Sequence, residues 1–181
     1  MTMKEKKKEL RSLIKKRKAE IPGSALKTLS TDILEALEQH PVFRSAHTIL
    51  LYHSLGDEVH THDFIEKWSA SKQIVLPVVV GDDLELRSYS SPADLSVGAY
   101  GILEPTGAPF NNYDTIDLAV IPGVAFDASG NRLGRGKGCY DRLLPKIVAP
   151  KIGICFPFQL VDEVPAETFD IQMDEVISSV S

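Results

Sequence analysis

Short apolar runs alternate with helical segments along most of this sequence, and this alternation constrains the fold more than any other feature. Four runs have the apolar, β-branched composition of strands buried on both faces of a sheet: residues 47–52, 73–80, 116–121 and 151–156. A helix is predicted at residues 61–71, between the first two runs, and another at 140–148, between the last two. Strand–helix–strand units form crossovers, so we predict a three-layer α/β fold with a mostly parallel, Rossmann-like sheet and helices on both faces.

Two amphipathic helices precede this alternation. Apolar side chains at helical spacing predict a first helix over residues 4–20, ended by a Pro-Gly pair, and a second from an N-cap at Ser24 to Pro41. Residues 81–90 break the parallel pattern, because a Gly-Asp-Asp turn is followed by alternating apolar and polar residues, which predicts a local antiparallel hairpin. The length of 181 residues and the 43% hydrophobic content are typical of one domain, which we expect to span residues 1–181.

Composition and charge limit the cellular context and the partners. The two cysteines, Cys139 and Cys155, form neither a disulfide framework nor a zinc motif, and no apolar run approaches the roughly 20 residues of a membrane span. The net charge is −5, although residues 1–18 carry nine of the 20 Lys and Arg residues without an interleaved aromatic side chain. We therefore expect a cytoplasmic protein that binds neither nucleic acid nor membrane.

The segment "NRLGRGKGCYDR", residues 131–142, is the strongest candidate for chemistry. It follows the predicted strand at 116–121 and opens a predicted helix, a place where ligands of open α/β sheets bind. Its glycines permit close approach of the main chain, and its cations would balance a bound phosphate. It is not a Walker A loop, because Gly138 follows Lys137 where Ser or Thr is required. The pattern alone indicates a phosphate loop of unknown kind or a mobile surface loop with solvated cations.

A longer stretch around this loop, "PGVAFDASGNRLGRGKGCYDR" at residues 122–142, resembles the signature of the 5-formyltetrahydrofolate cyclo-ligase family. Further matches occur in order along nearly the whole chain: K-x-x-L-R at 7–11, D-E at 57–58, Y-G-I-L-E-P at 100–105 and D-E-V-I at 174–177. The resemblance implies closure of 5-formyltetrahydrofolate to 5,10-methenyltetrahydrofolate, with ATP as co-substrate, Mg²⁺ as cofactor, and ADP and phosphate as products. It thereby implies a monomeric enzyme whose partners are these small molecules. In the family's scheme the formyl oxygen attacks the γ-phosphate, N10 attacks the activated carbon, and phosphate leaves.

The resemblance also implies roles for individual residues. The ATP-binding positions are Lys7, Arg11, Arg132, Gly134, Arg135, Gly136, Lys137, Gly138 and Tyr140. Arg135, followed by Lys137, is expected to stabilise charge on the transferring phosphoryl group. The folate-binding positions are His53, Glu58, Tyr100 and Tyr140, and the magnesium ligands are Asp141 and Asp174, with Asp170 as a neighbour that could assist. Cys139 is a departure, because the family commonly has an aromatic residue there.

Several of these residues also have an ordinary structural explanation. Asp141 would complement the dipole of a helix first turn, and Asp174 would be an exposed carboxylate at a strand edge. Glu58 would be a loop carboxylate, Tyr100 a packing residue, and His53 a structural histidine. The cations at 15–18 are predicted to lie on a solvated helix face.

Two other functions are compatible with parts of the pattern. The chain could be a non-catalytic nucleotide- or RNA-binding module that uses the basic first helix and the glycine loop, which would bind RNA with a steep salt dependence. It could also be a different, kinase-like ATP-dependent enzyme on the same scaffold. Neither alternative gives a role to Glu58, Tyr100 or Asp174, so the sequence favours the cyclo-ligase.

Overall fold

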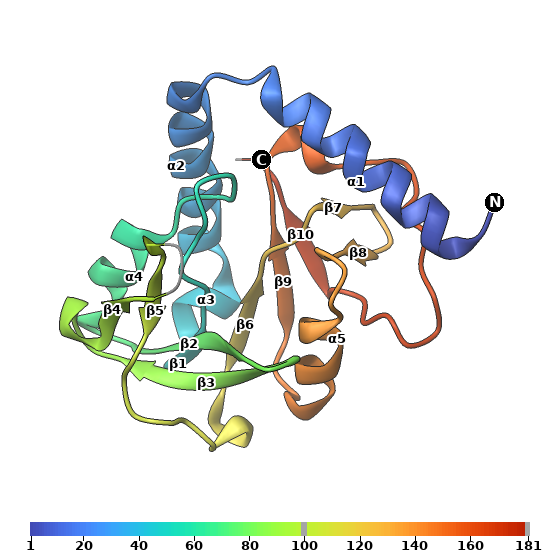
Figure 1. The fold of residues 1–181 in the computed structure, drawn as a ribbon. Coiled ribbons are helices and arrows are strands. Elements are labelled where there is room, and N and C mark those ends of the chain that lie inside the picture. Colours follow the sequence, from blue (N-terminus) through green and yellow to red (C-terminus); the bar gives the residue numbers. More distant parts are fainter. Residues whose placement is uncertain (99–100, 180–181) are drawn as a thin grey trace.

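A six-stranded sheet forms the centre of the computed structural model, which describes residues 1–98 and 101–179. Its strands are β1 (Thr48–Leu50), β2 (Gln73–Val80), β3 (Asp83–Tyr89), β6 (Leu118–Ile121), β9 (Lys151–Ile154) and β10 (Glu175–Ile177). They lie in the order β10-β9-β6-β1-β2-β3, and β3, at one edge, is the antiparallel strand (Figure 1). The predicted mostly parallel sheet and the predicted hairpin are therefore confirmed.

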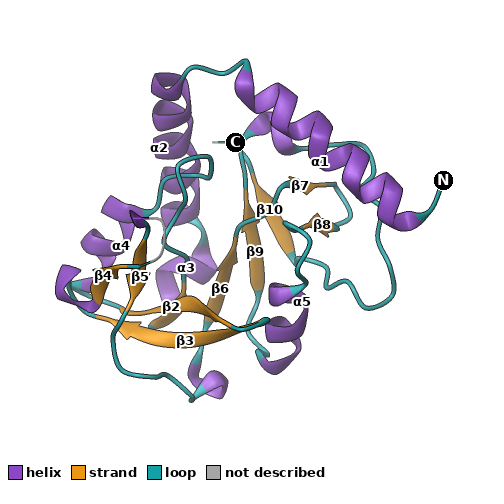
Figure 2. Cartoon of the chain, viewed as in Figure 1, coloured by secondary structure: helices purple, strands orange, loops and turns teal. Residues whose placement is uncertain are grey.

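Helices cover both faces of this sheet (Figure 2). They are α1 (Met3–Ala19), α2 (Gly23–Gln39), α3 (Pro41–Ser45), α4 (His62–Ser69) and α5 (Cys139–Leu143). Successive strand residues point to opposite faces, so Ile49 and Leu51 pack in the core under α2, α3 and α4, while Leu50 packs in the core under α5. All three side chains are fully buried, which explains why this strand has no polar alternation. No helix among the described residues is both long and apolar enough to cross a membrane.

Several element boundaries differ from the sequence-based predictions. The second helix begins at Gly23 after a Pro22 N-cap, so the predicted N-cap Ser24 lies inside it, and the carbonyl of Pro22 accepts from the first-turn amides. Pro41 ends the second helix and also begins α3. In a first turn the missing N–H of proline loses no intrahelical hydrogen bond. Nδ1 of His40 caps α3 by accepting from the amide of Val42. The helix predicted at 140–148 is shorter, because α5 ends at Leu143 and is followed by a 3-10 turn that contains a proline.

Two small hairpins and several 3-10 turns were not predicted. The long connection at 90–109 contains β4 (Leu95–Val97) paired with β5 (Leu103–Pro105), and the segment after β6 contains β7 (Ala125–Phe126) paired with β8 (Arg132–Leu133). The 3-10 turns of the described residues include Pro92–Asp94, Tyr113–Thr115, Leu144–Lys146 and Pro157–Gln159. Strands of two or three residues are too short to show a period in the sequence.

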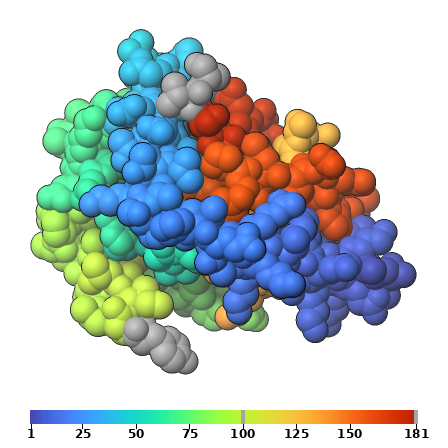
Figure 3. All heavy atoms as spheres, turned by 90° about the horizontal axis from the view of Figure 1, so that it is seen from above, coloured from blue at the N-terminus to red at the C-terminus, as the bar shows by residue number. Residues whose placement is uncertain are grey.

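Helix α1 lies across the carboxyl end of the sheet, beside β7 and β8 (Figure 1). Ile14 is its fully buried residue, and it packs against Ala125, Leu133 and Val164. Viewed from above, α1 forms a long surface ridge bordered by the segment that follows β9 (Figure 3). The N-terminal helix therefore covers the edge of the sheet where ligands of such folds bind.

Candidate active site

Three segments that are distant in the sequence meet at the carboxyl end of the sheet. They are α1, the loop at residues 51–61 that follows β1 (the β1 loop), and residues 134–138 (the glycine loop). Arg11 of α1 donates through Nε to the carbonyl of Gly134 over 2.8 Å. Arg135 donates through Nη2 to Asp57 over 2.9 Å, and the same nitrogen lies 3.7 Å from Oε2 of Glu58. The structure thus brings the predicted phosphate loop against the acid predicted to bind folate.

The glycine loop has a backbone that requires glycine at two positions. Gly136 has φ +115° and Gly138 has φ +68°, conformations that residues with a side chain rarely adopt. A Cβ at Gly136 would meet nothing closer than the guanidinium carbon of Arg11, at 3.7 Å, so conformation rather than space imposes glycine there. Lys137, between them, is exposed and forms no hydrogen bond or ion pair with any described residue.

Arg132 lies at the base of the glycine loop as a partly buried cation. Its Nε donates to the carbonyl of Pro122 over 2.6 Å, and its guanidinium lies over the ring of Tyr140, 4.9 Å from the centroid. A Cβ at Gly134 would approach both terminal nitrogens of Arg132 to 3.2 Å, so the main chain passes close over the guanidinium. Burial lowers the pKa of Arg132, and no carboxylate of the described residues forms an ion pair with it. A bound anion would be the ion-pair partner that the Arg132 guanidinium lacks among the described residues.

Glu58 is the most buried acid of the β1 loop, with 14% of its side chain exposed. Its Oε1 accepts from the amide of Leu55 over 2.8 Å. Burial raises the pKa of Glu58, while the hydrogen bond from Leu55 and the charge of Arg135 act in the opposite direction. Asp57 differs: burial would raise its pKa, but Lys18 and Arg135 outweigh burial and lower it. The loop therefore presents two neighbouring carboxylates with different environments.

His53, also predicted to contact folate, stacks on His62, with ring centroids 3.7 Å apart and an interplanar angle of 10°. Burial, followed by the neighbouring His62, lowers the pKa of His53 to about 4. His53 is therefore uncharged at neutral pH and presents a flat, half-buried ring. Tyr100, the third residue predicted to contact folate, lies outside the described residues.

Each of the two predicted magnesium ligands accepts a hydrogen bond from a main-chain amide. Oδ1 of Asp141 accepts from Ile171 over 3.1 Å, and Oδ2 of Asp174 accepts from Lys151 over 2.8 Å. Asp174 precedes β10, so it lies at the amino end of the parallel strands, the edge opposite to the β1 loop. The described residues contain no group of three or more His, Cys, Asp or Glu side chains that could hold a metal. Mg²⁺ usually binds one or two carboxylates together with substrate phosphates. The charge of Asp141 reaches Arg132 at the base of the glycine loop, whereas Asp174 lies at the opposite edge of the sheet.

The two α1 residues that are predicted to bind phosphate, Lys7 and Arg11, bond to other residues of the protein in this structure. Nζ of Lys7 lies 2.8 Å from Asp170 and 3.3 Å from Glu167, and these acids raise its pKa although burial acts to lower it. Asp170 is thereby a partner of Lys7. Lys18, predicted to be solvated, instead pairs with Asp57 at 3.1 Å. The sequence does carry a signal for this, because Lys18 is seven residues after Arg11 and so shares its helix face.

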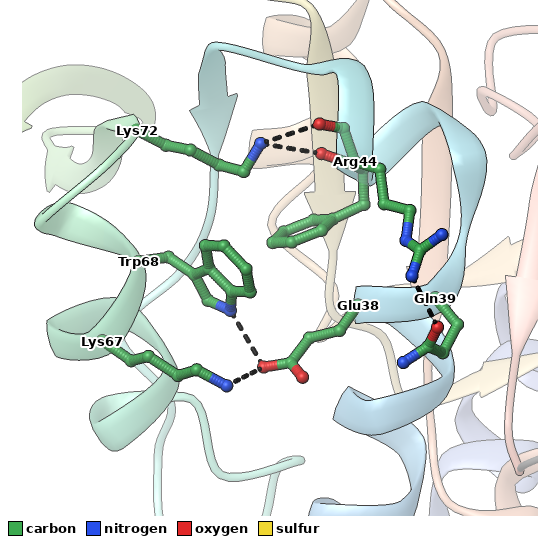
Figure 4. Close-up of a pocket in the computed structure, with 7 residues that line it drawn as sticks. Glu38, Gln39, Arg44, Lys67, Trp68 and Lys72 are labelled. Atoms are coloured by element: carbon green, nitrogen blue, oxygen red, sulfur yellow. Dashed lines mark hydrogen bonds and ion pairs between the residues drawn. The ribbon is translucent and has the colours of Figure 1, made fainter.

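Two cavities are formed by described residues outside the glycine loop and the β1 loop, and Asp174 is among the residues that line the second of them. One, of about 270 Å³, is lined by residues of α2, α3 and α4 and by Lys72, which follows α4 (Figure 4). There Glu38 accepts from Lys67 and from the Trp68 indole, and Lys72 donates to the carbonyls of Phe43 and Arg44. The other, of about 470 Å³, lies along β10 and the turn at 127–130. The polar groups of the first cavity bind one helix to another, which is a structural task.

Comparisons with known proteins find relatives that match nearly the whole chain. The profile of the 5-formyltetrahydrofolate cyclo-ligase family matches residues 3–179. The chain is 30% identical over 190 residues to the 5-formyltetrahydrofolate cyclo-ligase of Haemophilus influenzae, covering 96% of this chain and 97% of that protein. Identity to the Escherichia coli enzyme of the same name is 28% over 178 residues, covering 92% and 96%. The structure of 5,10-methenyltetrahydrofolate synthetase from Aquifex aeolicus superimposes with a TM-score of 0.84 and 34% identity, covering 95% of this chain and 89% of that one.

Proposed function

Because this chain belongs to the 5-formyltetrahydrofolate cyclo-ligase family, we propose that it closes 5-formyltetrahydrofolate to 5,10-methenyltetrahydrofolate with ATP and Mg²⁺, releasing ADP and phosphate. Family membership makes the chain an enzyme, which removes the non-catalytic binding module from consideration. The observation that carries the finer proposal is the contact between the glycine loop and the β1 loop, where Arg135 meets Asp57 and Glu58. A phosphate held by the first loop and a folate held by the second would be neighbours.

Glu58 is the folate-binding residue in this proposal. An ionised carboxylate accepts two N–H groups side by side, the pattern that the amino-pyrimidinone edge of a pterin offers. The hydrogen bond from Leu55 leaves Oε2 of Glu58 directed toward Arg135, at the boundary between the two substrates. His53 and Tyr140 would supply flat ring surfaces beside the pterin, and Tyr100 remains an expectation for the same role.

The glycine loop binds the phosphates of ATP in this proposal. Its main-chain amides, with Lys137 and Arg132, would surround the terminal phosphates, and Lys7 and Arg11 would add positive charge from α1. Arg135 is half exposed, as is its partner Asp57, and an exposed pair of this kind is worth only about 0–1 kcal/mol. The γ-phosphate carries more charge than Asp57, so the guanidinium would exchange the carboxylate for the phosphoryl group.

The reaction then divides into two displacements. The formyl oxygen attacks the γ-phosphorus, the bond from phosphorus to the bridging oxygen breaks, and ADP leaves. N10 attacks the formyl carbon, the carbon–oxygen bond breaks, phosphate leaves, and N10 gives up its proton. Arg135 and Lys137 would stabilise the charge that develops on the phosphoryl oxygens in the first displacement. Magnesium, when bound, supplies charge neutralisation on the phosphates, and Asp141 would be its protein ligand.

A spectrophotometric assay tests the proposal. Purified protein with ATP, Mg²⁺ and 5-formyltetrahydrofolate is expected to produce the methenyl chromophore, and omission of ATP or Mg²⁺ is expected to abolish it. Arg135→Ala should lower kcat/KM by about 10²-fold or more, because a cation that stabilises a phosphoryl transition state contributes at least this much. Arg44→Ala is the matched control, since Arg44 lies on α3 and its guanidinium bonds Gln39. Folded protein that forms no chromophore would disprove the proposal.

A further inference from the structure

The β1 loop is closed at its base by two buried hydroxyl residues. Thr61 is fully buried and Ser54 is 6% exposed. The amide of Ser54 donates to Oγ1 of Thr61 over 3.1 Å, and the amide of Thr61 donates to Oγ of Ser54 over 3.0 Å. The two residues therefore exchange hydrogen bonds across the six residues between them. We call this pair the Ser54–Thr61 clasp.

Further hydrogen bonds extend the clasp to the end of β1. The hydroxyl of Thr61 donates to the carbonyl of Tyr52 over 2.5 Å, and the phenol of Tyr52 donates to the carbonyl of Val59 over 3.3 Å. Nε2 of His62 lies 2.8 Å from the carbonyl of Ser54. The Thr61 hydroxyl thus both donates and accepts a hydrogen bond inside the protein. Because these bonds are buried, they favour one orientation of the side chain.

The use of Thr61 is unusual for its place in the chain. Thr61 is the N-cap of α4, where a threonine hydroxyl normally accepts from an amide of the first helical turn. Here the side chain forms no such cap bond to α4. Its hydroxyl turns away from the helix toward Tyr52 and Ser54. Helix α4 therefore lacks a side-chain N-cap hydrogen bond, and the Thr61 hydroxyl stabilises the β1 loop instead.

Glu58 lies at the tip of the β1 loop, between the two residues of the clasp. Within the tip, the amide of Leu55 donates to the Glu58 carboxylate over 2.8 Å, and the amide of Glu58 donates to the carbonyl of Leu55 over 3.1 Å. Leu55 follows Ser54 directly, so a change in the clasp moves the residue that orients Glu58. Glu58 in turn faces Arg135 across 3.7 Å. The clasp, the hydrogen bonds between Leu55 and Glu58, and the glycine loop therefore form one continuous series of contacts.

We propose that Thr61 and Ser54 are positioning residues that hold Glu58 in the orientation that places the folate against the phosphoryl-binding loop. The inference rests on the proposed role of Glu58 in folate binding. It assigns no contact between either hydroxyl and a substrate. The effect of the clasp is therefore selective for the folate, whereas a general loss of folding would affect both substrates alike.

The test compares Thr61→Val, which keeps the shape and removes the hydroxyl, with Thr61→Ser, which restores it. Thr61→Val should raise KM for 5-formyltetrahydrofolate by about tenfold, since lost hydrogen bonding in a buried site commonly has this effect. KM for ATP should change by less than about twofold, and Thr61→Ser should restore the folate KM. Thr48→Val is the matched control, because Thr48 is also buried and bonds Gln73 from the start of β1. It should lower the melting temperature and leave the folate KM unchanged.

A double-mutant cycle separates this inference from the proposed function. If Thr61 acts through Glu58, Thr61→Val should change the folate KM by less than about twofold in a Glu58→Gln background. A Glu58→Gln variant with a normal folate KM would refute the role of Glu58 itself. Glu58→Gln with a raised folate KM, together with Thr61→Val at the wild-type value, would overturn the clasp alone. If Thr61→Val does not fold, Ser54→Ala decides by the same criteria.

Discussion

Replacing Gly136 by alanine should damage the phosphate loop without introducing a clash. A Cβ at this position would have its nearest neighbours, the guanidinium atoms of Arg11, at 3.7 to 3.8 Å, which is ordinary contact distance. The penalty therefore comes from the backbone, because φ is +115° and alanine disfavours this region. Strain of this kind costs about 1–3 kcal/mol, and the loop can escape it by changing conformation.

The assay for Gly136→Ala is kcat/KM for ATP together with thermal unfolding. If the loop conformation holds the phosphates, the strain of about 1–3 kcal/mol should lower kcat/KM by about 5- to 150-fold. Gly81→Ala is the matched control, because Gly81 also has positive φ, +63°, and has no atom within 4 Å of an added Cβ, but it lies at the turn between β2 and β3. It should lower stability and keep wild-type kinetics. Equal kinetics for the two variants would refute the reasoning.

Two further predictions concern α1 and the histidine pair. Arg11→Ala removes the 2.8 Å hydrogen bond to the Gly134 carbonyl, so KM for ATP should rise by about fivefold, while Lys8→Ala, on the exposed face of α1, should leave it unchanged. The pKa of His53 falls from 6.5 to about 4 on folding, so the unfolded chain binds this proton more readily, and stability should fall as pH drops from about 6.5 toward 4. His53→Phe should flatten that decline in urea unfolding measured across this range. An unchanged slope would exclude His53 as its cause.

The arrangement of the sheet was predictable because burial on both faces leaves a plain sequence pattern. Leu50 enters one core and Ile49 and Leu51 the other, so the whole run must be apolar. The β7–β8 hairpin was not predictable, since two-residue strands have no period. The end of the second helix at Pro41 was predicted, but the same proline also starts α3, because proline fits a first turn as well as it ends a helix.

The candidate site divides in a similar way. Arg135 and Glu58 were predicted separately from a resemblance, and the structure brings them together. The distance between them depends on how the β1 loop and the glycine loop fold over the sheet, which no local pattern encodes. Thr61 was missed because a threonine at the start of a helix is ordinarily a cap, and its hydroxyl instead bonds the β1 loop. Asp174 was assigned to the metal by resemblance, but its place at the amino end of β10 follows from the strand direction.

The central claim is that the glycine loop holds the γ-phosphoryl group of ATP against the formyl oxygen of a folate bound beside Glu58. Isotopic labelling tests this most directly: 5-formyltetrahydrofolate carrying ¹⁸O in its formyl group is converted with unlabelled ATP, and the released phosphate is analysed by mass spectrometry. Transfer of the formyl oxygen to phosphorus predicts one ¹⁸O atom in each phosphate released. Methenyl product and ADP accompanied by phosphate without the label would contradict the account.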